Sequence, residues 1–127
     1  IVRNPIDNCW SIYKNYFATK IDFGNDLNDL SNYYKSYQNL MLFWKNIFPN
    51  DIYDLKYENL VNNTEYEIKK LLKFCSLDWD KNCLQHHKNK RVIKTISFNQ
   101  ARRPIYNTSL KSYSGYENYL TELKDLT

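Results

Sequence analysis

Residues 1–13, with the sequence IVRNPIDNCWSIY, decide how the rest of the chain is interpreted. Two β-branched residues lead into Arg3, as at the end of a buried strand. Pro5 suits the first position of a helix, because its fixed φ is helical and its missing N–H is not needed there. Asn4 is placed to cap that helix, and Asp7 complements the positive end of the helix dipole. The stretch therefore predicts a strand end, a short loop and a helix that begins at Pro5.

The start of this helix is a candidate anion site. Backbone N–H groups at a helix N-terminus attract anions. Arg3 lies just before the expected helix, and Ser11 lies about two turns along it. An arginine offers a planar fork of donors, and a serine hydroxyl donates without adding charge, so the two side chains are suited to one phosphate. The alternative is an ordinary helix start whose arginine pairs with a nearby carboxylate, and the motif by itself leaves this open.

The composition is that of a folded protein. The chain has 127 residues, enough for one domain with a modest core, and we find no repeat or linker that would divide it. Its 43% hydrophobic and 17% aromatic content, with two glycines, excludes disorder. A net charge of +4 suits an anionic ligand. No signal peptide and no membrane-spanning apolar run is present, and the strand-like opening without a Met indicates a chain cut from something longer.

The cysteines and histidines do not predict a metal site. Cys9, Cys75 and Cys83 are widely spaced and odd in number, which is typical of reduced, mostly buried thiols in a cytoplasmic protein. His86 and His87 lie near Cys83 and invite a metal interpretation. Adjacent histidines point in different directions on a helix, and no second cysteine pair completes a tetrahedral set. We therefore expect no metal.

The spacing of apolar residues predicts a mostly helical chain. Helices are expected over residues 5–17, over 27–48 with a cap at 25 or 26, from a cap at 63 or 64 to a break at 77–80, over 81–87 and over 113–126. Thr64 and Glu67 have capping-box spacing. Residues 49–51 predict a turn, and the β-rich residues 52–57 predict a strand.

Three of these helices carry apolar residues on one face. In the helix that starts at the cap at 63 or 64 they are Ile68, Leu71, Leu72 and Cys75. In the other two helices we expect the apolar residues to face a core. In the long helix they are Leu30, Tyr34, Tyr37, Met41, Trp44 and Phe48. In the terminal helix they are Tyr116, Tyr119 or Leu120, and Leu123.

A basic segment separates the last two expected helices. Of the eighteen basic residues, six lie here: Lys88, Lys90, Arg91, Lys94, Arg102 and Arg103. The segment has weak periodicity and predicts an exposed functional loop, with Arg102 toward a ligand and Arg103 toward solvent. A nucleic-acid patch is the alternative, but the aromatic residues are not interleaved as stacking platforms would be.

Four stretches in order resemble the C-terminal half of a sulfotransferase that uses 3′-phosphoadenosine-5′-phosphosulfate. They are RNPIDNCWSIY (residues 3–13), LKYENL (55–60), LLKFCSLDWD (71–80) and TISFNQARRPIY (95–106). The chain is most similar to the bacterial branch often fused to tetratricopeptide repeats, which is also similar to the tyrosylprotein sulfotransferases. The resemblance implies an α/β fold of the P-loop-NTPase-like kind, a three-layer nucleotide-binding sheet of which this chain, mostly helical, would be the C-terminal part.

The resemblance implies seven nucleotide-binding residues. They are Arg3, Ser11, Tyr57, Ser97, Gln100, Arg102 and Lys111. Arg3 and Ser11 would hold the 3′-phosphate, Tyr57 would contact the adenine or its surroundings, and the 97–106 segment would fold over the nucleotide. Many relatives have a basic residue directly before an aromatic residue that corresponds here to Tyr113. Here that position is Ser112, and Lys111, one place earlier, is the substitute.

The resemblance also implies what lies outside this sequence. A Gly-rich loop for the 5′-phosphosulfate and the general base are expected upstream of Ile1, so we name no catalytic residue. The chain would be one partial domain, residues 1–127, and would supply the 3′-phosphate half of the site without being active alone. The donor nucleotide and a hydroxyl or amine acceptor are the expected partners, with no metal and no nucleic acid, in the cytoplasm. The alternative is a non-catalytic helical interaction module or nucleotide-binding remnant with a basic loop.

Overall fold

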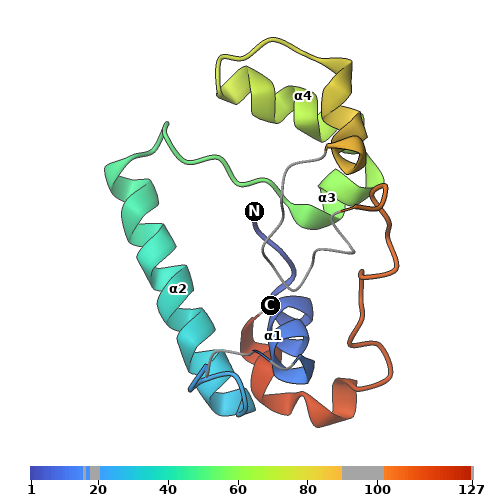
Figure 1. The fold of residues 1–127 in the computed structure, drawn as a ribbon. Coiled ribbons are helices and arrows are strands. Elements are labelled where there is room, and N and C mark those ends of the chain that lie inside the picture. Colours follow the sequence, from blue (N-terminus) through green and yellow to red (C-terminus); the bar gives the residue numbers. More distant parts are fainter. Residues whose placement is uncertain (16, 18–20, 90–101, 127) are drawn as a thin grey trace. The chain divides into compact units, whose positions relative to one another are not determined.

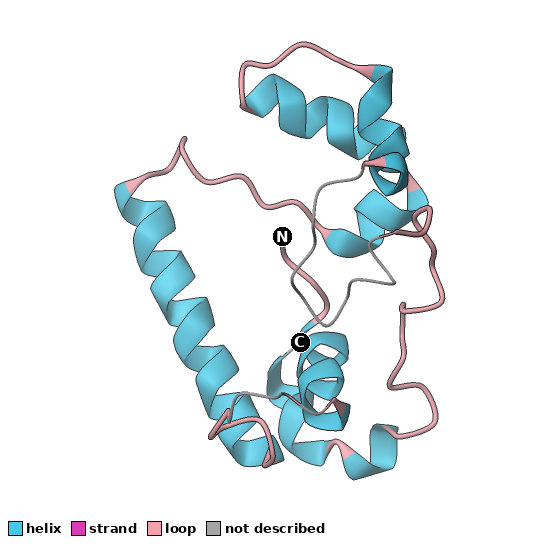
Figure 2. Ribbon diagram, viewed as in Figure 1, coloured by secondary structure: helices cyan, strands magenta, loops and turns pink. Residues whose placement is uncertain are grey.

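The computed structural model describes residues 1–15, 17, 21–89 and 102–126, which are mostly helical (Figure 2). The helices are α1 (Pro5–Lys14), α2 (Leu27–Ile47), α3 (Tyr57–Asn62) and α4 (Thr64–Phe74), followed by the 3-10 helices η1 (Lys81–Lys88), η2 (Glu117–Tyr119) and η3 (Thr121–Leu126) (Figure 1). Two compact units are present: a terminal unit of Val2–Asp54 with Leu110–Thr127, and a central unit of Leu55–Ser109 with Ile1.

In the terminal unit, α1 begins as the sequence predicts. The Asn4 Oδ1 atom accepts a hydrogen bond from the Asp7 N–H at 3.1 Å, and Pro5 is the first helical residue. The helix ends at Lys14, short of the predicted residue 17. The reason is local: Asn15 is extended, with φ −102° and ψ 136°, and its side-chain amide donates to the Ser11 carbonyl at 2.6 Å.

The long helix α2 confirms its predicted bounds to within one residue. Asp26 caps it, with its Oδ1 accepting from the N–H groups of Asn28 at 2.8 Å and Asp29 at 3.0 Å. The predicted core stripe is correct only in part. Leu30 and Tyr34 are buried, and Met41 is half-buried. The later members are exposed by 37% to 45%, namely Tyr37, Trp44 and Phe48.

The core of the terminal unit forms where α1, α2 and η3 contact one another. Its buried members are Cys9, Tyr34, Leu120, Leu123 and Leu126. The predicted helix over 113–126 is replaced by turns and the short helices η2 and η3, with Gly115 at φ +91° interrupting any continuous helix. Leu120 and Leu123 point inward as predicted, whereas Tyr116 and Tyr119 are exposed.

The predicted strand over residues 52–57 is wrong. Among the described residues only isolated bridge positions occur, at Val2 and Lys56, and α3 begins at Tyr57 (Figure 2). A β-rich segment becomes a strand only when neighbouring strands satisfy its N–H and C=O groups. No such ladder is present in the part of the chain that the structure describes.

In the central unit, α4 starts where the sequence predicts but without a capping box. Asn63 is the N-cap, and Thr64 is already helical and donates its hydroxyl to the Leu60 carbonyl at 2.8 Å. Glu67 is buried and lies 3.4 Å from the amino group of Lys70. The Thr64 hydroxyl therefore ties α4 to α3.

The end of α4 and the start of η1 also match the predicted break. Ser76 adopts φ 55°, and the Leu77 N–H donates to the Leu72 carbonyl at 2.8 Å, which closes the helix as a Schellman turn. Asp80 then caps η1 by accepting from the Asn82 N–H at 2.8 Å.

Burial of Cys9 predicts slow thiol chemistry. Its side chain is 1% exposed, and burial raises the pKa of the thiol from 9.0 to about 11. The fold favours the neutral thiol, so this stabilisation is complete below pH 9 and is lost as pH rises through about 11. At pH 8 we expect iodoacetamide to label exposed Cys75 in the native protein while Cys9 stays unlabelled until unfolding. Equal labelling rates, followed by peptide mass spectrometry, would contradict this.

The exposed stripe of α2 predicts self-association. It consists of Tyr33, Tyr37, Leu40, Trp44 and Ile47, which recur at spacings of four and three and are all 37% or more exposed. Monomers rarely leave so continuous an apolar face in water. We expect concentration-dependent association in sedimentation velocity, and Leu40→Lys should reduce it. Leu42, which is 61% exposed but lies off the stripe, provides the control: Leu42→Lys should leave association unchanged. A monomeric wild-type chain at high concentration would refute the expectation.

Candidate functional site

One face of α1 holds the C-terminal segment around Lys111. The carboxylate of Asp7 is 1% exposed, and its Oδ2 accepts from the Lys111 N–H at 2.8 Å. Its Oδ1 accepts from the Ser112 N–H at 2.7 Å and from the Ser112 hydroxyl at 3.2 Å. One turn further along, the Trp10 indole N–H donates to the Ser112 carbonyl at 3.1 Å. Residues 111–112 are therefore bonded to α1 through both their N–H groups and a carbonyl.

Three of the predicted binding residues lie in the terminal unit, on α1 or next to it. Ser11 follows Asp7 by four positions, so it lies on the same face of α1. Lys111 is held to that face through its backbone, and its side chain is exposed. Arg3 lies directly before the helix cap at Asn4. The terminal unit thus combines a helix N-terminus, a hydroxyl and two cationic residues, which is a suitable donor set for a phosphate.

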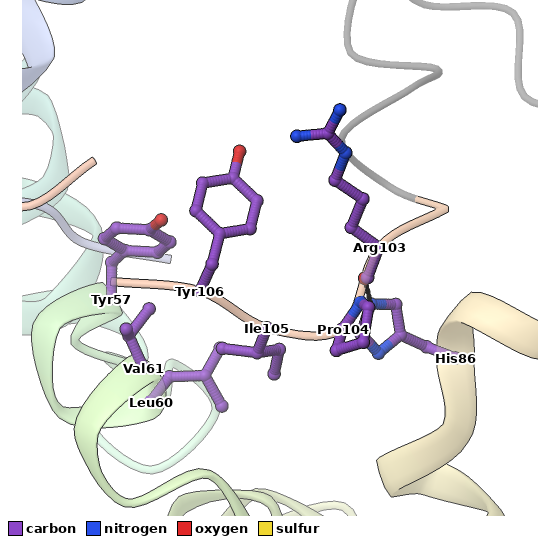
Figure 3. Close-up of a pocket in the computed structure, with 8 residues that line it drawn as sticks. All are labelled: Tyr57, Leu60, Val61, His86, Arg103, Pro104, Ile105 and Tyr106. Carbon is purple, nitrogen blue, oxygen red and sulfur yellow. Dashed lines mark hydrogen bonds between the residues drawn. The ribbon is translucent and has the colours of Figure 1, made fainter. Parts of the chain in front are cut away.

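A second feature, in the central unit, is a small cavity beside α3. Its volume is about 150 Å³, and its lining residues are Tyr57, Leu60, Val61, His86, Arg103, Pro104, Ile105 and Tyr106. Figure 3 shows the Tyr106 ring and the Arg103 guanidinium pointing the same way, with Leu60 and Ile105 on the other side of the segment. Sites that enclose whole drug-sized ligands are about 300–1,000 Å³, so this cavity suits one planar ring.

Tyr57, at the start of α3, lines the cavity as one of the predicted nucleotide-binding residues. Arg103 is exposed, as the sequence predicts, and also lines the cavity, whereas Arg102 is not among the lining residues. The carbonyl of Arg103 lies 3.1 Å from Nε2 of His86, so the imidazole ring anchors this segment. Ser97 and Gln100 lie outside the described residues.

Among the described residues, no three His, Cys, Asp or Glu side chains are grouped so that they could hold a metal ion. None of the helices in the described ranges is long and apolar enough to cross a membrane. Two features are therefore taken further: the face of α1 that holds residues 111–112, and the cavity beside α3.

Comparison with known proteins identifies the family of this chain. The model of the sulfotransferase family matches residues 1–81, which include Arg3, Ser11 and Tyr57. The chain belongs to the sulfotransferase family. This sulfotransferase chain is 35% identical over 127 residues to an uncharacterized protein of Aquifex aeolicus (strain VF5). The alignment covers 98% of the chain and 17% of that relative, and no solved structure matches the chain.

The sequence of this sulfotransferase chain does not predict several of the contacts found at these two features. The sequence predicts only that Asp7 complements the helix dipole, and that Ser112 stands where many relatives have a basic residue. The two are 105 positions apart, so no local pattern links them. Arg103 and Tyr106 belong to a segment recognised as functional, but sequence alone does not say which of its side chains face a cavity.

Proposed function

We propose that this chain supplies the 3′-phosphate-binding part of a sulfotransferase site that uses 3′-phosphoadenosine-5′-phosphosulfate. The family match supports sulfuryl transfer. The observation that carries the finer proposal is that residues 111–112 are hydrogen-bonded to the face of α1 that bears Ser11. This helix begins directly after Arg3 and its cap Asn4. A 3′-phosphate distinguishes this donor from ATP, and the terminal unit offers charged and neutral donors for it.

We assign the residue roles from the family resemblance, and each of the two features supports its own part of the assignment. Arg3, Ser11 and Lys111 bind the 3′-phosphate, while Tyr57 and Tyr106 offer aromatic rings to the adenine. In the reaction, the acceptor oxygen or nitrogen forms a bond to sulfur as the bond between sulfur and the 5′-phosphate oxygen breaks. The acceptor proton passes to a base that this chain does not supply. Such transfer depends mainly on positioning and on stabilising charge, and holding the nucleotide contributes the positioning.

The remaining parts of the proposal concern the whole protein. The chain spans 17% of the relative's length, and we place residues 1–127 in a partial domain of a P-loop-like three-layer fold. The 5′-phosphosulfate loop and the general base belong to the upstream part, so the chain alone is expected to be inactive. Ser97, Gln100 and Arg102 complete the loop over the nucleotide. The enzyme acts in the cytoplasm, needs no metal, and belongs to the branch associated with tetratricopeptide repeats.

Isothermal titration with two nucleotides tests this proposal. Adenosine 3′,5′-bisphosphate should bind at least 10-fold more tightly than adenosine 5′-phosphate, because the 3′-phosphate adds charge-assisted hydrogen bonds worth about 1.5–3 kcal/mol. Equal binding of the two nucleotides would overturn it. The competing candidate is a non-catalytic helical interaction module, favoured by the exposed stripe of α2. That candidate predicts no nucleotide preference.

A further inference from the structure

We propose that Asp7 is a positioning residue: it fixes Lys111 on the phosphate-binding face of α1 and so determines the affinity for a ribose 3′-phosphate. The inference rests on the proposed function and adds to it a residue that itself touches no ligand. The side chain of Asp7 is fully occupied by the C-terminal segment. It accepts from Lys111 N–H at 2.8 Å, Ser112 N–H at 2.7 Å and Ser112 Oγ at 3.2 Å. Its effect on a phosphate is therefore indirect.

The backbone of Lys111 indicates that this position is imposed rather than adopted freely. Its φ is 52°, in the left-handed region that non-glycine residues rarely enter. Such a conformation persists where surrounding contacts determine it. Here the contacts are the Asp7 carboxylate on one side and the Trp10 indole, which donates to the Ser112 carbonyl at 3.1 Å, on the other.

The position of this segment on α1 connects it with the phosphate donors. Trp10 and Ser11 follow Asp7 by three and four positions, so all three residues lie on one side of the helix. Residues 111–112 form hydrogen bonds with Asp7 and Trp10. The backbone of Lys111 is therefore held on the side of α1 that carries Ser11. The lysine is exposed, so its amine is available to an anion that approaches the helix N-terminus.

The test measures how tightly the chain binds adenosine 3′,5′-bisphosphate and adenosine 5′-phosphate. The melting temperature of each variant is measured as well. Asp7→Ala should weaken bisphosphate binding roughly 10-fold or more and leave monophosphate binding unchanged. Asp7→Asn should lose less, because the amide oxygen can still accept from Ser112 while the NH₂ group cannot accept from Lys111. Asp29→Ala, which removes an acid from the first turn of α2, should leave both affinities unchanged.

A second variant keeps the test valid if Asp7→Ala fails to fold. Lys111→Gly preserves the backbone bond and suits φ 52°, but it deletes the amine. It should reduce bisphosphate binding without lowering the melting temperature, and adding Asp7→Asn to it should cost no further affinity. If Asp7→Asn and Lys111→Gly both fold and keep the wild-type preference, the positioning role is overturned while the proposed function stands. If the wild-type chain has no preference, both are overturned.

Discussion

Replacing Arg3 with alanine is expected to abolish most of the preference of this chain for a 3′-phosphorylated nucleotide. Arg3 lies immediately before the cap of α1, at the positive end of the helix dipole. An arginine contributes a fork of donors to a phosphate, and charge-assisted hydrogen bonds are worth about 1.5–3 kcal/mol, or roughly 10- to 100-fold in affinity. Titration with adenosine 3′,5′-bisphosphate should show this loss, whereas adenosine 5′-phosphate should bind as before.

The matched control for Arg3 is Lys14, at the other end of the same helix. Lys14→Ala removes one positive charge from the last turn of α1, where a phosphate is not favoured. It should leave the preference for the bisphosphate intact. If both variants weaken binding equally, the effect comes from net charge and not from a site at the helix start.

Replacing Leu123 with alanine is expected to have the largest effect on stability. Leu123 is 0% exposed and belongs to the core cluster shared by α1, α2 and η3. Leu→Ala changes at such positions cost about 2–5 kcal/mol, because they remove apolar contacts and leave a cavity. That is a large part of the ~5–15 kcal/mol by which a typical protein is stable. Thermal unfolding followed by circular dichroism should show a melting temperature lower by roughly 10 °C.

The control for Leu123 is Tyr119, in the neighbouring helix η2. It is 77% exposed, so Tyr119→Ala should change stability by no more than about 0.5 kcal/mol. A loss equal to that of Leu123→Ala would mean that the C-terminal segment packs differently from the structure. An unchanged melting temperature for Leu123→Ala would show that η3 does not contribute to the core.

The sequence was sufficient for features that depend on neighbouring residues. The Asn4 cap with Pro5, the Asp26 cap and the break after α4 are all present, because each depends on a few adjacent side chains and backbone groups. The family was also recognisable, since its motifs are local strings such as residues 3–13, and the family match over residues 1–81 confirms it. The individual binding roles of Arg3, Ser11 and the other residues stay predictions.

Only the tertiary structure decided features that join distant parts of the chain. The bonds from Asp7 to Lys111 and Ser112 span more than a hundred residues, and no pattern in either segment encodes them. The predicted strand over residues 52–57 did not form, because a strand depends on partners elsewhere. The predicted core residues of α2 are all apolar or aromatic, yet among them only Leu30 and Tyr34 are buried. Burial depends on what packs against a helix, and periodicity defines the apolar face without saying what covers it.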